Sequence, residues 1–135
     1  MARIFIIEDE PVAAKNISRI LKEEGYEIAG IASDCEKASE MINTKQVDLV
    51  VCNLYLKFTF SGKDIIQLIR SVKNIPFVFL SSYTHDARLN SILRTKSEIY
   101  LSSPYTKEQL LGSINRLLRN LSRFNSSNVP PLIVL

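Results

Sequence analysis

The chain is predicted to fold as an α/β domain of three layers, in which a parallel sheet of five strands is covered by helices on both faces. Short apolar segments alternate along the chain with segments whose apolar residues recur at helical spacing. The segments 47–52 and 77–80 are apolar almost throughout, which is typical of strands buried on both faces of a parallel sheet. Strands that alternate with helices in this way form parallel sheets, because each helix carries the chain back across the sheet.

Local signals mark the elements in order. The predicted strands are 2–7, 26–32, 47–52, 77–80 and 99–101, and the predicted helices begin at Pro11 and at Ser33 or Asp34 and then span 62–72, 86–94 and 106–121. Pro11 suits the first position of a helix, since its missing N–H has no acceptor there. Gly25 suits the turn that ends this helix. The residues of the first two helices expected to face the core are Val12, Ile17, Ile20, Leu21, Ala38, Met41 and Ile42.

The last helix has a clear start. Thr106 is its predicted N-cap, and Glu108 or Gln109 can complete a capping box with it. Its apolar stripe consists of Leu110, Leu111, Ile114, Leu117, Leu118 and Leu121.

Length and composition indicate one domain, residues 1–122, followed by a linker or tail at 123–135. The tail is rich in Asn and Ser, and Pro130 with Pro131 prevents a helix from continuing through it. Its apolar end, Leu-Ile-Val-Leu, is expected to pack on a neighbour or to begin a further segment.

The chain is expected to be cytoplasmic. It has no apolar stretch near the roughly 20 residues that a membrane-spanning helix needs, and the apolar run at 4–7 is too short for the core of a signal peptide. Cys35 and Cys52 are predicted to be reduced and structural, because two cysteines, one of them in a buried strand, do not form a disulfide framework.

Positive charge is concentrated in the C-terminal part of the chain. The net charge is +3, whereas the part from His85 onward carries seven Lys or Arg residues against three acids. This excess fits either a solvated helix face or a surface that binds an acidic protein. Basic runs with interleaved aromatic residues are absent from the sequence, so nucleic-acid binding by this domain is not expected.

Polar side chains follow the predicted strands at the edge where ligands bind in open α/β sheets. Glu8 and Asp9 follow the first strand, Asn53 the third, Ser81 the fourth and Ser103 the fifth. Two carboxylates beside an amide oxygen can hold Mg²⁺. Alternatively, the three consecutive acids that end at Glu10 merely cap the helix that begins with Pro11.

Four segments together resemble the receiver domain of two-component response regulators: Ile6-Ile-Glu-Asp-Glu-Pro11, Asp48-Leu-Val-Val-Cys-Asn53-Leu-Tyr-Leu, Phe79-Leu-Ser-Ser82 and Tyr100-Leu-Ser-Ser-Pro104. The resemblance covers residues 2 to about 121. It implies a flavodoxin-like, doubly wound (βα)5 fold with sheet order 2-1-3-4-5. It also implies an acid pair that binds Mg²⁺, an Asp that accepts a phosphoryl group at the end of the third strand, and a Lys at the end of the fifth.

The sequence matches this pattern at Glu8, Asp9, Ser81 and Tyr100 and departs from it where the chemistry occurs. Asn53 stands at the position of the phosphoryl-accepting Asp, and Ser103 stands at the position of the Lys. An amide is neutral and a poor nucleophile toward phosphorus, and without the Lys a charge-assisted contact to the phosphoryl oxygens is missing. Phosphorylation at Asn53 is therefore not expected.

The resemblance also assigns roles to the remaining site residues. A weak Mg²⁺ site is expected to use Glu8, Asp9, Asn53 and the backbone carbonyl of Tyr55, and the protein is expected to require no cofactor. Ser81 stands at the Ser/Thr switch position. Tyr100 matches the switch aromatic, although a tyrosine on a short edge strand is equally well explained by packing.

The sequence favours a non-enzymatic pseudo-receiver that contacts a histidine kinase, a regulator, an output domain or a second copy of itself through 85–121. The alternative is a receiver that is still phosphorylated, at a serine or after deamidation of Asn53. A flavodoxin-like cofactor binder is disfavoured, because the acidic loop 8–11 would repel an anionic cofactor.

Overall fold

The computed structural model describes residues 1–54, 71–72, 75–81, 98–102 and 104–127, except for the side chains of 81 and 121–127. The strands are β1 (Arg3–Ile7), β2 (Glu27–Ala32), β3 (Leu49–Asn53), β4 (Phe77–Ser81) and β5 (Glu98–Ser102), and the helices of the described ranges are α1 (Pro11–Glu23), α2 (Cys35–Thr44) and α5 (Lys107–Ser127). Two predicted helices lie outside the described residues. These are 86–94 and 62–72, of which only residues 71 and 72 are described.

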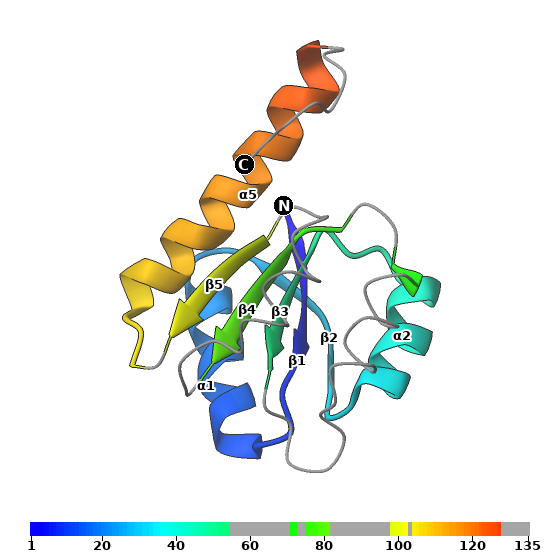
Figure 1. Cartoon of the computed structure of the whole chain (residues 1–135), viewed down its shortest axis with the longest axis vertical. Helices are drawn as coiled ribbons and strands as arrows, with labels where there is room; N and C mark the ends of the chain where they lie inside the picture. The colour runs from blue at the N-terminus through cyan, green and yellow to red at the C-terminus, as the bar shows by residue number, and fades with distance from the viewer. Residues whose placement is uncertain (55–70, 73–74, 82–97, 103, 128–135) are drawn as a thin grey trace.

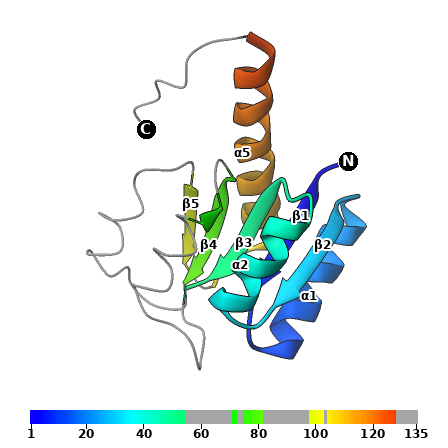
Figure 2. The same ribbon diagram turned by 90° about the vertical axis from the view of Figure 1, so that its right-hand side faces the viewer.

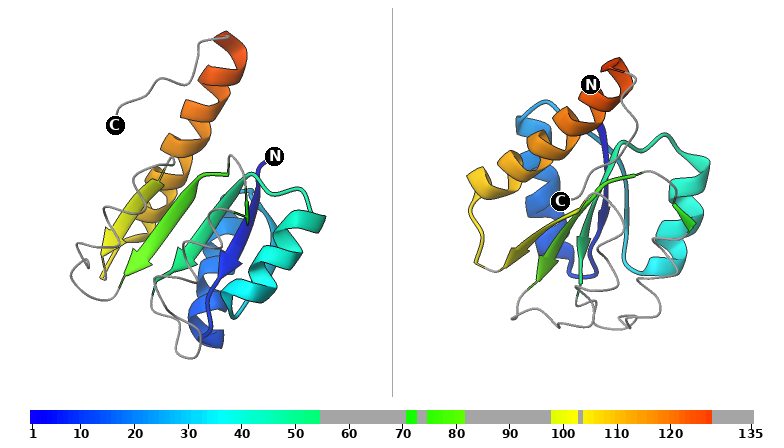
Figure 3. Two further views of the ribbon diagram at one scale, coloured as in Figure 1. Left: turned by 45° about the vertical axis from the view of Figure 1, so that its right-hand side comes forward. Right: turned by 45° about the horizontal axis from the view of Figure 1, so that its top comes forward.

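All five strands run parallel in one sheet of order β2-β1-β3-β4-β5, which confirms the predicted fold class and strand order (Figure 1). The sheet separates two apolar clusters. Phe5, Ile7, Cys52 and Phe79 belong to the cluster that α2 covers. The opposite cluster contains the buried residues of α1 and α5. These two helices cover the other face of the sheet (Figures 2 and 3). Because the three central strands β1, β3 and β4 are buried on both faces, their sequences are almost continuously apolar.

Helix α1 begins and ends as its sequence indicates. Pro11 is its first residue, the Glu10 side chain caps it by accepting a hydrogen bond from the Ala13 N–H at 2.9 Å, and Gly25 lies just beyond it with a φ of 97°. Glycine adopts this left-handed conformation at little cost. Val12, which was expected to face the core, is 74% exposed. It lies about 140° around the helix from Ile17, so it is off the buried stripe.

The other described helices also have the expected caps. The Asp34 carboxylate accepts a hydrogen bond from the Lys37 N–H at 2.7 Å at the start of α2. Thr106 and Gln109 form the predicted capping box, with hydrogen bonds of 2.8 and 3.0 Å.

Helix α5 is longer than its apolar stripe indicates. It continues to Ser127, whereas the predicted helix ends at 121. No glycine or proline lies between 122 and 127, so no residue of this part interrupts the helix. The helix therefore continues into the part expected to be a linker or tail, and the division of the chain at 122 stays a prediction. Among the helices described, none is both long enough and apolar enough to cross a bilayer.

Candidate functional site

The candidate site lies where β1 and β3 end side by side. Ile7, the last residue of β1, pairs with Cys52, and Asn53 is the last residue of β3. This register brings Glu8, the next residue of the chain after β1, opposite Asn53. Glu8 is 7% exposed, although it lies at an edge of the sheet. The structure thus brings together two residues that are 45 positions apart.

The Asn53 amide is hydrogen-bonded to the Glu8 carboxylate. Its Nδ2 donates to Oε1 at 3.0 Å and to Oε2 at 3.2 Å. Oε2 also accepts a hydrogen bond from the backbone N–H of Glu10 at 3.1 Å. An ionised carboxylate can only accept hydrogen bonds, so the nitrogen of the amide, not its oxygen, faces Glu8. Both carboxylate oxygens of Glu8 therefore have protein donors.

The electrostatics of the site are dominated by burial. Loss of solvent raises the pKa of the Glu8 carboxyl above its ordinary value, and a side-chain hydrogen bond with Asp9, together with the charge of Asp9, raises it further. The hydrogen bonds from the Glu10 N–H and the Asn53 amide oppose this shift. Burial also raises the pKa of Tyr105, with a smaller contribution from the charge of Glu8. Cys52, the residue before Asn53, is fully buried, and this raises the pKa of its thiol well above the ordinary value.

The three consecutive acids have different surroundings. Glu10 caps α1, as the simpler interpretation of the sequence predicts. Glu8 accepts hydrogen bonds from the nitrogen of the Asn53 amide. Asp9 lies close enough to Glu8 for its charge to raise the Glu8 pKa. Helix capping is therefore confirmed for Glu10, and the expected metal site stays a prediction.

The described residues fit Mg²⁺ poorly. Mg²⁺ binds oxygen ligands, but Asn53 presents N–H groups to Glu8. A cation between the two side chains would meet these hydrogens and would compete with them for both oxygens of Glu8. Within the described ranges, no three His, Cys, Asp or Glu side chains gather where they could share a metal ion. Tyr55, the fourth expected ligand, lies outside these ranges.

The remaining predicted site residues are placed in part. Ser81 is the last residue of β4, which is the expected position, but its side chain is not described. Ser103 lies outside the described residues. Tyr100 on β5 is half-buried, and its ring stacks on that of Phe79 with centroids 5.3 Å apart. This contact shows that the ring packs against the core, and its role as a switch stays a prediction.

Tyr105 is a residue that the sequence did not single out. It is half-buried and packs against the apolar cluster under α1 and α5. It is also near enough to Glu8 for that charge to raise its pKa. Its position immediately after Pro104, close to the carboxyl end of β5, is the sequence signal that could have identified it as a neighbour of the site.

Comparisons with known proteins agree with this architecture. The family model described as the response regulator receiver domain matches residues 4–115. Sensory transduction protein BceR of Halalkalibacterium halodurans is 27% identical over 126 residues, which cover 93% of this chain and 54% of that protein. Transcriptional regulatory protein YvrH of Bacillus subtilis is 30% identical over 129 residues, which cover 94% of this chain and 54% of that protein. The chain thus spans about half the length of these curated relatives.

A solved structure shows the same fold. The receiver domain protein (CheY-like) from Methanospirillum hungatei superposes with a TM-score of 0.80 at 18% identity, covering 91% of this chain and 98% of that one. At this identity the likeness supports the fold alone. The family model, in contrast, matches most of the sequence, including the segments that form β1, β3 and the site between them. The chain therefore belongs to the response regulator receiver domain family of two-component signalling.

Proposed function

We propose that this receiver works in two-component signal transduction without being phosphorylated at position 53. It is a cytoplasmic, non-enzymatic module that acts through contacts with other proteins or by regulating an attached output domain. The observation that carries this proposal is the Asn53 amide, which lies at the phosphoryl-acceptor position and donates two hydrogen bonds to Glu8.

The chemistry of the site supports the proposal. Attack on phosphorus needs an anionic or otherwise activated nucleophile, whereas Asn53 is neutral and its nitrogen is engaged with Glu8. The sequence places Ser103 where the family pattern has a Lys, so the expected cation partner of a phosphoryl group is missing as well.

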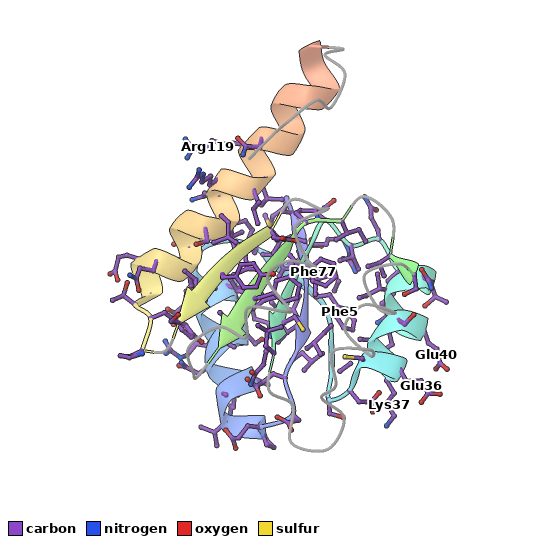
Figure 4. All side chains as sticks on the ribbon, viewed as in Figure 1. Phe5, Glu36, Lys37, Glu40, Phe77 and Arg119 are labelled. Atoms are coloured by element: carbon purple, nitrogen blue, oxygen red, sulfur yellow. The ribbon has the colours of Figure 1, made fainter. Side chains whose placement is uncertain are left out.

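The proposed contact surface is 85–121, of which β5 and much of α5 are described. Lys107, Arg116 and Arg119 on α5 are exposed, against a single acid, Glu108, among the residues of this helix. Arg119 points away from the sheet (Figure 4). A basic helix face of this kind fits an acidic protein surface, on a histidine kinase, a regulator, an output domain or a second copy, better than it fits nucleic acid.

The test is exposure of the wild-type protein to acetyl phosphate and MgCl₂, followed by intact-mass measurement. The expected result is an unchanged mass. The double variant Asn53→Asp/Ser103→Lys restores both family residues and is the positive control, expected to gain a phosphoryl group. A stoichiometric adduct on the wild type would contradict the proposal, and peptide mapping would then distinguish a phosphorylated serine from a deamidated Asn53.

A further inference from the structure

We infer that the Asn53 amide replaces a bound divalent cation in this pocket, so that the ends of β1 and β3 are held together without metal. The inference rests on the proposed function, because it assumes that Asn53 keeps its amide. It goes beyond that function by stating what holds the pocket together and how the pocket responds to Mg²⁺.

The first step is the need for compensation at Glu8. A carboxylate that is 7% exposed is unstable unless other groups compensate its charge. The ion pairs of the described ranges are Arg3–Glu27 and Arg19–Glu23, and neither involves Glu8. The compensation that the structure shows comes from N–H groups, two contacts from the Asn53 amide and one from the Glu10 backbone.

The second step is the position of these donors. The Asn53 nitrogen lies 3.0 and 3.2 Å from the two oxygens of Glu8, so it bridges both of them, as a small cation between two strand ends would. The positive ends of its N–H dipoles occupy the place where a cation would otherwise neutralise Glu8. Mg²⁺ could reach Glu8 from the side of β3 only if the amide rotated and gave up both hydrogen bonds.

The third step is the effect of restoring the acid. A carboxylate at position 53 has no hydrogen to donate, and it would face Glu8 beside Asp9. Like charges at this distance repel one another and destabilise the fold. A divalent cation would then bind between them and stabilise the folded state by mass action. Mg²⁺ dependence should therefore appear on Asn53→Asp and be absent from the wild type.

The experiment is thermal unfolding in EDTA and in MgCl₂ at matched ionic strength. The wild-type Tm is expected to be the same in both. Asn53→Asp is expected to have a lower Tm in EDTA and to gain roughly 5 °C in MgCl₂, as one ligand at about tenfold its Kd gives. Asn43→Asp makes the same chemical change at an exposed position of α2 and is expected to show no gain from Mg²⁺.

A wild-type Tm that rises with MgCl₂ as much as that of Asn53→Asp would overturn the inference, and so would an Asn53→Asp variant that folds but ignores Mg²⁺. If Asn53→Asp does not fold, calorimetric titration of the wild type with MnCl₂ decides: absence of binding supports the inference and saturable binding overturns it. Neither readout depends on phosphoryl transfer. A wild type that binds metal but gains no mass from acetyl phosphate would overturn this inference and leave the proposed function standing.

Discussion

At the amino edge of the sheet a carboxylate pairs with a cation, whereas at the carboxyl edge a carboxylate pairs with an amide. Arg3, the first residue of β1, donates from its backbone N–H to the Asp48 carboxylate at 2.7 Å and from its guanidinium to Glu27 at 2.8 Å and to the Gln46 carbonyl at 3.0 Å. At the other edge, Glu8 is held by Asn53 and by the Glu10 N–H. The strands β1 and β3 are thus joined at their two ends by different chemistry.

The difference concerns burial as well as charge. The Arg3 and Glu27 side chains are 33% and 51% exposed, so water screens their attraction. Glu8 is almost completely buried, so each of its hydrogen bonds contributes more to stability. The carboxyl edge should therefore be sensitive to the loss of one neutral group, and the amino edge should tolerate the loss of a charged one.

The largest effect is expected for Asn53→Ala. This change leaves the buried Glu8 carboxylate without its amide donor and should lower the free energy of unfolding by about 2–3 kcal/mol. The loss should shrink at acid pH, where protonated Glu8 needs less compensation. Urea unfolding at two pH values measures both quantities. Asn43→Ala, at an exposed position of α2, is the control, and an equal loss there would show that the cost does not come from the contact with Glu8.

A smaller loss is expected for Asp48→Ala at the amino edge. The Asp48 side chain accepts the Arg3 N–H in a partly buried position, and its removal should cost about 1–2 kcal/mol in urea unfolding. The backbone hydrogen bond from the Asp48 N–H to the Arg3 carbonyl, at 2.8 Å, would remain. Asp48→Asn keeps an acceptor and should recover part of the loss. Equal stability of the two variants would show that the side-chain hydrogen bond contributes nothing.

Glu98, the first residue of β5, is an acid of the amino edge whose surroundings differ from those of Asp48 and Glu27. Within the described part of the chain, its Oε2 is buried and has no hydrogen-bond partner. Burial raises its pKa from 4.5 to about 7. The folded state therefore binds a proton more tightly than the unfolded state does, and this stabilising contribution is lost as pH rises from about 4.5 through about 7. Glu98→Gln should remove this part of the pH dependence.

The measurement for Glu98→Gln is the free energy of unfolding at about pH 5 and about pH 8, compared with that of the wild type. Between these two pH values the free energy of unfolding should fall less in the variant than in the wild type. Glu40→Gln, at an exposed position of α2 (Figure 4), should leave the wild-type pH dependence intact. If the free energy of unfolding of Glu98→Gln depends on pH as strongly as that of the wild type, Glu98 is not the source of this pH dependence.

The smallest effect is expected for Glu27→Gln. It removes the exposed ion pair with Arg3 and should cost about 0.2–1 kcal/mol. Added salt should reduce the difference from the wild type, because salt screens exposed pairs. A loss as large as that of Asn53→Ala, or one that persists in high salt, would show that the amino edge depends on charge as strongly as the carboxyl edge does.

Local chemistry explains which parts of the fold could be predicted. The start of α1 at Pro11, its end before Gly25 and the capping box of Thr106 with Gln109 each depend on residues a few positions apart. The end of α5 depends on no such signal. Pro130 limits where the helix can end, but the residues before it are compatible with either helix or coil.

The site was predictable in its location and not in its contacts. Strand ends indicated that Glu8, Asp9 and Asn53 would be neighbours, because parallel strands meet at one edge. The sequence could not show that Glu8 turns inward to Asn53 while Glu10 turns to the Ala13 N–H. That choice depends on the register of β1 against β3, which joins residues 45 positions apart. The Arg3–Asp48 contact was missed for the same reason.

Helix α5 begins near the carboxyl edge and continues past the amino edge (Figure 1). Its 21 residues span about 31 Å, roughly twice the length of a five-residue strand. Because the helix is long, a small rotation produces a large displacement at its end. A tilt of about 5° at the first turn of α5 moves its last turn by about 3 Å. A small tilt at the start of α5, near the carboxyl edge, would therefore become a much larger displacement beyond the amino edge.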